Sequence, residues 1–158
     1  MWLSSRRRFL LVALALAGCG FTPVNGVNSN SQMLRNTVLV QAPTNRAEFE
    51  LVRNLEVQLG QATSKLYDLR YKLTVDEEII VISDAQEVNR FSLVGLLKYS
   101  LVDNDGVVLL SETAKFFTGY SATGTTVATE RSKRDAYDRL MVILAKQVSN
   151  ALLTLDRP

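Results

Sequence analysis

The fold of this 158-residue chain is decided by residues 90–117, RFSLVGLLKYSLV-DNDG-VVLLSETAKFF. Apolar side chains alternate with other residues from Phe91 to Leu101, which indicates a β-strand with one face on a core. The residue types of Asp103–Gly106 tolerate the positive φ of tight turns, so Val107–Phe117 is expected to return as the partner strand of a hairpin. A symmetric turn would make three cross-strand pairs: Lys98 with Ser111, Leu96 with Thr113, and Val94 with Lys115.

The upstream stretch Leu66–Val75 has the same two-residue period. A strand with this alternation covers a core on one side and meets a polar environment on the other. Glu77–Ile82 either continues this strand or adds a short one, and Ser83–Asn89 is expected to be a polar loop. The apolar face holds Tyr67, Leu69, Tyr71, Leu73 and Val75, and the polar face holds Asp68, Arg70, Lys72 and Thr74.

Two segments with a helical period flank these strands. The first begins at Asn45, which with Glu48 resembles a capping box, and it ends at Gly60. The second runs from about Val127 to Leu155, after the small-residue loop Gly119–Thr126. In both segments apolar side chains recur every three or four residues, so each helix turns one side to a core.

A β-branched run at Thr37–Ala42, stopped by Pro43, predicts one more strand before the first helix. The order of elements is therefore β-α-β-β-β-α. A crossover helix after the first strand, followed by hairpin-connected strands, predicts an α+β fold. We expect a two-layer sandwich, a mostly antiparallel sheet with two helices on one face, over residues 34–158.

The N-terminus has the features of an export signal. Arg6, Arg7 and Arg8 precede an apolar run, Phe9–Ala17, that is shorter than the roughly 20 residues of a bilayer span. Cys19 follows small residues and resembles the acylated cysteine of bacterial lipoproteins. Residues 1–18 are thus expected to be a lipoprotein signal peptide and residues 19–33 a lipidated tether. A transmembrane anchor or a signal peptide without lipidation is the alternative, and both the Sec and the twin-arginine export routes fit.

Composition excludes several functional classes. The chain has no histidine and one cysteine, which removes the Ser-His-Asp and Cys-His nucleophile systems and almost every zinc site. Loss of residues 1–18 removes three arginines, so 18 basic and 16 acidic residues become 15 and 16, a charge near −1. A basic nucleic-acid-binding surface is therefore not expected. We predict a protein that is not an enzyme and holds no metal or cofactor.

Three motifs that could carry chemistry have simpler interpretations. Asp103–Gly106 lacks the further ligands and distal glutamate of a calcium loop and is better explained as a turn. Asp76-Glu77-Glu78 is expected to be a solvated strand end, because successive strand residues point to opposite faces. Gly119–Gly124 lacks the following Lys-Ser/Thr of a phosphate loop.

Basic residues on the outer face of the sheet form the main candidate site. A cation beside apolar residues suits an anionic amphiphile, which offers phosphates and acyl chains together. The alternative is an ordinary solvated sheet face. The candidate residues are Arg70, Lys72, Lys98 and Lys115, interleaved with Val94 and Leu96.

Several short motifs, taken in order, resemble the LptE family of lipopolysaccharide-assembly lipoproteins. They are Cys19-Gly20-Phe21-Thr22-Pro23, Tyr71-Lys72-Leu73, Leu93-Val94-Gly95, and the Tyr120–Thr126 loop before Arg134-Asp135-Ala136. In that family a small α+β sandwich plugs a large outer-membrane β-barrel, LptD, helps it assemble and binds lipopolysaccharide. The resemblance implies an outer-membrane location, with Gly20 in place of the aspartate of inner-membrane lipoproteins.

By the same resemblance, Arg70, Lys72, Lys98 and Lys115 are the candidates to bind lipid A phosphates, and Cys19 is the candidate for lipidation. The sequence leaves open which face of the sheet meets the barrel and whether lipopolysaccharide is bound directly. The alternative function is a free-standing lipid-binding or carrier lipoprotein without a barrel partner, which would need an internal apolar cavity.

Overall fold

The structure, a computed structural model, describes residues 33–82, 88–122 and 124–155. The predicted signal peptide, Cys19 and nearly all of the predicted tether lie outside the described residues. The elements follow the predicted order β-α-β-β-β-α, which confirms the α+β class. They are β1 (Val38–Val40), α3 (Arg46–Leu59), β2 (Tyr67–Ile82), β3 (Val88–Asp103), β4 (Val108–Ser121) and α4 (Thr126–Leu153).

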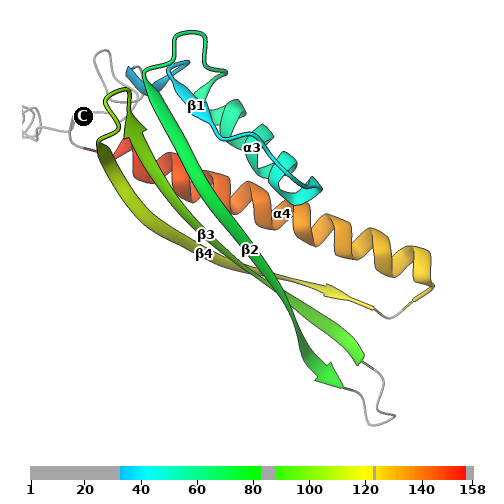
Figure 1. The fold of residues 1–158 in the computed structure, drawn as a ribbon. Coiled ribbons are helices and arrows are strands. Elements are labelled where there is room, and N and C mark those ends of the chain that lie inside the picture. Colours follow the sequence, from blue (N-terminus) through cyan, green and yellow to red (C-terminus); the bar gives the residue numbers. More distant parts are fainter. Residues whose placement is uncertain (1–32, 83–87, 123, 156–158) are drawn as a thin grey trace, which may run out of the picture.

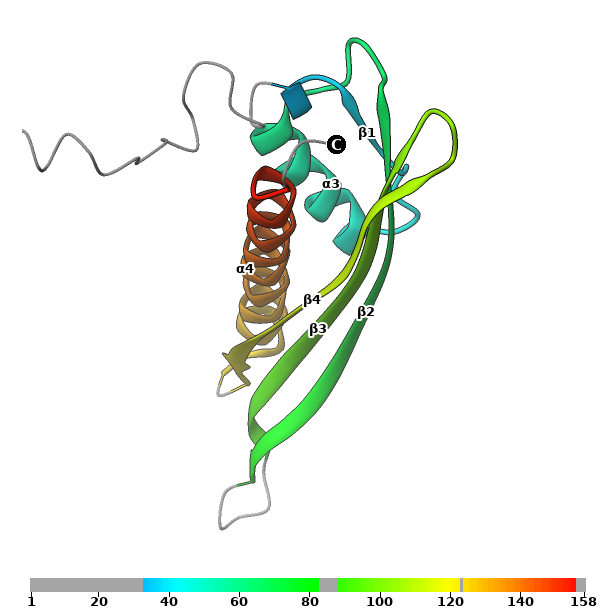
Figure 2. The same ribbon diagram turned by 90° about the vertical axis from the view of Figure 1, so that its left-hand side faces the viewer.

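The sheet and the helices form two layers. The sheet has the order β1-β2-β3-β4, with β1 parallel to β2 and the other neighbours antiparallel. Helices α3 and α4 both cover the same face, and the far ends of β2 and β3 run beyond the helix layer (Figures 1 and 2). The predicted two-layer sandwich is thus confirmed.

β1 is shorter than the predicted strand Thr37–Ala42, whereas β2, β3 and β4 run beyond their predicted bounds. β2 runs without a break to Ile82, so Glu77–Ile82 continues the strand rather than forming a separate one, with register shifts against β3 between Ile79 and Ile82. β3 begins at Val88, inside the predicted loop. β4 extends to Ser121, which places the first residues of the predicted small-residue loop in the sheet.

The predicted pairing of the β3–β4 hairpin is wrong by two residues. The structure pairs Lys98 with Thr113, Leu96 with Lys115, and Val94 with Phe117. The cause is the turn, which is one residue longer than a symmetric two-residue turn, and a further register shift between Leu101 and Val102. Because a shift of two residues preserves the alternation of side chains, the faces of the strands are as predicted.

The turn itself is held by Asp103. Its carboxylate accepts hydrogen bonds from the backbone N–H groups of Asp105 (2.9 Å) and Val107 (2.8 Å), and its own N–H donates to the carbonyl of Val107 (3.0 Å). Gly106 has φ +84°, the left-handed conformation that closes a three-residue hairpin loop. A calcium interpretation is unnecessary, because this carboxylate is used by the turn.

The helix boundaries follow from their caps. The side chain of Asn45 accepts a hydrogen bond from the N–H of Glu48 (3.0 Å), as predicted. The Glu48 carboxylate accepts from the N–H of Thr44 (2.7 Å), one residue before the position of a standard capping box. Hydrogen bonds to the ionised Glu48 carboxylate lower its pKa, and the bond from the Thr44 backbone N–H has the largest effect. α3 ends at Gly60, which has φ +80°.

The core fills the space between the layers. Leu97 and Leu101 of β3 and Leu140 and Leu144 of α4 have no exposed surface. Each such side chain contributes roughly 1.5–3 kcal/mol by burial. α4 approaches β3 closely at Gly95, where an added Cβ would lie 3.0 Å from side-chain carbons of the two α4 leucines.

Candidate functional site

The four predicted basic residues share one face of the sheet. Arg70 and Lys72 lie on β2, Lys98 on β3 and Lys115 on β4, and all four are exposed. The register places Lys72 opposite Lys98, and Lys115 opposite Leu96, which lies two residues from Lys98 along the same face. This face is the one away from α3 and α4, so the predicted grouping is found in the structure.

Lys72 and Lys98 are directly opposed like charges. Cβ atoms of such a pair lie about 4.5–5.5 Å apart, and the repulsion is destabilising by a few tenths of a kcal/mol to about 1 kcal/mol. Among the described residues, neither lysine forms an ion pair. The fold therefore gains no stability from this pair of charges. In this respect the opposed lysines differ from an ordinary surface salt-bridge network.

Apolar side chains adjoin these cations. Val94 and Leu96 are half-buried on the same face, and Phe117, opposite Val94, is 67% exposed. Phe117 was not among the predicted site residues. It lies two residues after Lys115 in a strand, and this spacing alone would have placed it on the basic face.

The charge of the outer face changes along β2. Arg70 and Lys72 are followed on the same face by Thr74, Asp76 and Glu78, all exposed. On β2, the basic residues thus lie in the half of the strand nearer β1 and the acidic residues in the other half. No group of acidic, histidine or cysteine side chains suited to a metal ion occurs in the part of the chain that the structure describes.

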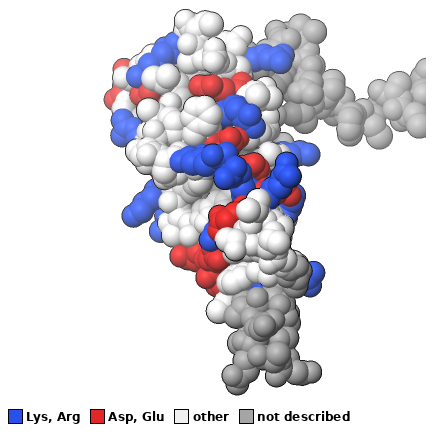
Figure 3. Space-filling view, turned by 90° about the vertical axis from the view of Figure 1, so that its right-hand side faces the viewer, with Lys and Arg blue, Asp and Glu red and all other residues white. Residues whose placement is uncertain are grey.

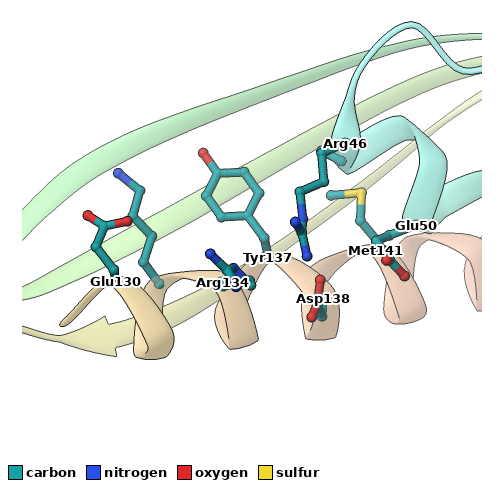
Figure 4. A pocket seen from close by; sticks show the side chains of 9 residues that line it. Arg46, Glu50, Glu130, Arg134, Tyr137, Asp138 and Met141 are labelled. Atoms are coloured by element: carbon teal, nitrogen blue, oxygen red, sulfur yellow. The ribbon is translucent and has the colours of Figure 1, made fainter. Parts of the chain in front are cut away.

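A second candidate is a groove of about 260 Å³ on the helix side. Figure 4 shows Arg46 pointing from α3 toward α4, where Arg134, Tyr137 and Asp138 lie. Figure 3 shows this end of the molecule, where α4 begins, with Lys and Arg side chains mixed among Asp and Glu. The groove therefore offers no charge of a single sign to a ligand.

Next to this groove an ion pair fixes α4 to the sheet. Lys133 Nζ lies 2.6 Å from the carboxylate of Glu77, which also accepts a hydrogen bond from the hydroxyl of Tyr120 (2.7 Å). Burial raises the pKa of Glu77, but the two hydrogen bonds and the Lys133 charge together lower it below its usual value. Burial, and then the bond to Glu77, raise the pKa of Tyr120 to about 12. Glu77 is thus exposed, as predicted for this strand end, and in addition it joins α4 to the sheet.

The comparisons with known proteins agree with this architecture. The family model described as LptE, lipopolysaccharide-assembly, matches residues 35–152. The chain belongs to the LptE family. Members are non-catalytic structural lipoproteins, so the predicted absence of enzymatic activity is confirmed by the family. Family membership also implies a role in lipopolysaccharide assembly and is consistent with an outer-membrane lipoprotein.

Solved structures show the same fold at low identity. A presumed lipoprotein from Caulobacter crescentus superposes with a TM-score of 0.66 at 20% identity, over 79% of this chain and 93% of that one. Rare lipoprotein B from Shewanella oneidensis gives 0.57 at 8%, over 73% and 91%. Lipoprotein B from Nitrosomonas europaea gives 0.59 at 15%, over 82% and 88%. No curated protein sequence matches this chain.

Within the described ranges, neither α3 nor α4 combines the length and the apolar content that crossing a bilayer requires.

Proposed function

We propose that this LptE-family protein is a lipid-anchored plug of an LptD-type β-barrel and that the outer face of its sheet binds lipopolysaccharide during transport to the outer membrane. The observation that carries the proposal is the direct opposition of Lys72 and Lys98, which form no ion pair with any described residue, beside Lys115 and an exposed Phe117. A cluster that costs the fold stability is best explained by a ligand.

The chemistry of lipid A matches this face. Its phosphates are anions. A lysine binds a phosphate as a point charge, and an arginine binds it through two parallel N–H donors, as Arg70 would at the edge of the cluster. Its acyl chains are apolar and suit Val94, Leu96 and Phe117. An anion between Lys72 and Lys98 would convert their mutual repulsion into attraction to a shared partner.

The anchor in this proposal is Cys19. Cleavage after residue 18 would free its amine and thiol for acylation, and two or more chains would hold the protein stably where one would not. The tether, residues 19–33, spans at most about 50 Å when extended. The domain that begins at residue 34 would therefore remain within reach of the membrane surface, where a barrel partner lies.

The alternative, a free-standing lipid carrier, needs an apolar cavity. The layer between sheet and helices is instead filled by side chains without exposure, such as Leu97 and Leu144. The groove beside α3 and α4 is open and lined mainly by charged residues. Both observations favour the plug.

Affinity purification of the full-length protein from detergent-solubilised outer membranes tests the proposal. We expect a large β-barrel protein to co-purify in stoichiometric amount, together with lipopolysaccharide. Mass spectrometry of the N-terminal peptide should find an acylated Cys19. Recovery of the lipoprotein alone, or with lipid and no barrel, would overturn the plug in favour of the carrier.

A further inference from the structure

The outer face of the sheet changes character in steps from the β1 end toward the far ends of β2 and β3. Each step is a row of side chains, one from each of β2, β3 and β4. The register gives three successive rows: Lys72 with Lys98 and Thr113, then Thr74 with Leu96 and Lys115, then Asp76 with Val94 and Phe117. Rows lie two residues apart, so the face passes from cations to acids within about 13 Å.

The apolar side chains of these rows form a strip on the β3–β4 half of the face. Val94 and Leu96 are half-buried and Phe117 is 67% exposed, and we call these three residues the apolar strip. On the β2 half, Asp76 and Glu78 are exposed beside it, and neither forms an ion pair with a residue that the structure describes. A ligand on the apolar strip therefore has two uncompensated acids along one side.

These acids oppose an anion at this end of the face. Asp76 lies opposite Val94, and neighbouring strands are about 4.8 Å apart, so a phosphate over Val94 would lie about 5 Å from the carboxylate. Repulsion between single charges at that distance disfavours the phosphate about fourfold in water at low salt. A neutral acyl chain meets no such repulsion. The far end of the face thus rejects phosphates and accepts acyl chains.

The opposite direction offers no continuous apolar surface. Toward β1, the next row after the lysines holds Arg70, Ser100 and Ser111. The exposed Leu39 lies one row further, opposite Asp68. An acyl chain that left the lysines in this direction would first cover polar and charged side chains. The polar end of an amphiphile fits here better than its chains do.

We propose, building on the proposed function, that lipopolysaccharide lies along the outer face in one direction, with its phosphates at Lys72 and Lys98 and its acyl chains on the apolar strip. Asp76 and Glu78 are then specificity-determining residues, because they keep the anionic end of the lipid away from the strip. They also act against a linear polyanion, which would place charge beside both acids once it extends past the lysines. The face therefore selects an anionic amphiphile over a polyanion without acyl chains.

Tryptophan fluorescence of the mature protein tests the direction. Trp2 is the one tryptophan of the chain and lies in the predicted signal peptide, so Phe117→Trp and Ser111→Trp each provide a single reporter. Both positions are exposed on β4, on either side of Lys115. On saturation with purified lipopolysaccharide below its aggregation concentration, we expect the emission of the Phe117→Trp protein to shift to shorter wavelength and that of the Ser111→Trp protein to change little.

The outcomes separate this direction from the proposed function. Equal shifts of the two reporters, or a larger shift of the Ser111→Trp protein, would overturn the direction while leaving lipopolysaccharide binding in place. Absence of binding by the wild type and by both reporter proteins would overturn the proposed function and the direction together.

Selectivity tests the two acids, with dextran sulfate as a soluble polyanion. Asp76→Asn/Glu78→Gln should bind dextran sulfate about tenfold more tightly than the wild type at low salt, with little change in affinity for lipopolysaccharide. The control, Glu56→Gln/Glu130→Gln, removes the same charge from the helices and should gain clearly less. An equal gain by the two double variants, at wild-type melting temperatures, would reduce the effect to net charge and overturn the role of Asp76 and Glu78.

Discussion

The two faces of the sheet are built from the same three long strands but follow opposite rules. Toward the helices, Leu97, Leu101 and their neighbours are fully buried, and nearly every side chain there contributes to stability. On the outer face, two lysines oppose each other and Phe117 is exposed. The difference indicates that the inner face specifies the fold and the outer face is free to serve binding.

The largest effect is expected on the inner face. Leu144→Ala should lower the free energy of unfolding by about 3–5 kcal/mol, because it leaves a cavity where α4 packs on β3. Chemical denaturation followed by circular dichroism measures this. The matched control is Val142→Ala in the same helix, where the valine is 45% exposed. This variant should lose less than about 1 kcal/mol of stability. Equal losses would contradict the assignment of faces.

The close approach of the layers provides the next test. Gly95→Ala places a methyl group 3.0 Å from terminal carbons of Leu140 and Leu144, so these side chains or the helix that carries them must shift to admit it. We expect a loss of about 1–3 kcal/mol. Restoring space with Leu140→Ala in the same chain should recover part of this loss relative to the sum of the two single variants. Strict additivity would mean that the two sites do not meet.

The far end of the sheet should respond to pH through Glu77. The pKa of Glu77 is lower in the folded state than the ordinary value of 4.5. The stability that the ionised carboxylate adds to the fold is therefore fully present above pH 4.5 and is lost as the pH falls through the folded pKa. Glu77→Gln should remove up to about 1 kcal/mol at neutral pH. The difference between variant and wild type should narrow toward pH 3 in urea titrations. A difference that stays constant with pH would exclude the ion pair with Lys133.

The smallest effect, and one of opposite sign, is expected on the outer face. Lys98→Glu converts the repulsion with Lys72 into attraction and should raise stability by about 0.2–1 kcal/mol. Thermal unfolding at low salt measures the change, which added salt should reduce. Lys146→Glu, at an exposed position of α4, is the control. Destabilisation by Lys98→Glu alone would show that the basic face supports the fold.

The sequence was sufficient to predict the element order and the two faces, because alternation and helical spacing are local signals. The wrong hairpin register at Lys98 arose because Gly106 closes a longer loop, a choice that residue types alone do not distinguish. The pairing of Glu77 with Lys133 could not be predicted, since it joins elements distant in the chain. Phe117 was missed although the predicted strand included it, because the candidate site was chosen by its cations, and the two-residue spacing from Lys115 was not followed to the end of the strand.

Lipopolysaccharide binding by the outer face is the central claim, and a direct titration tests it best. Full-length wild type, Lys98→Glu/Lys115→Glu and Lys146→Glu would be titrated with purified lipopolysaccharide below its aggregation concentration. We expect the double variant to lose at least about tenfold in affinity while being at least as stable as the wild type, and Lys146→Glu to bind normally. Unchanged binding by the stable double variant would contradict the account.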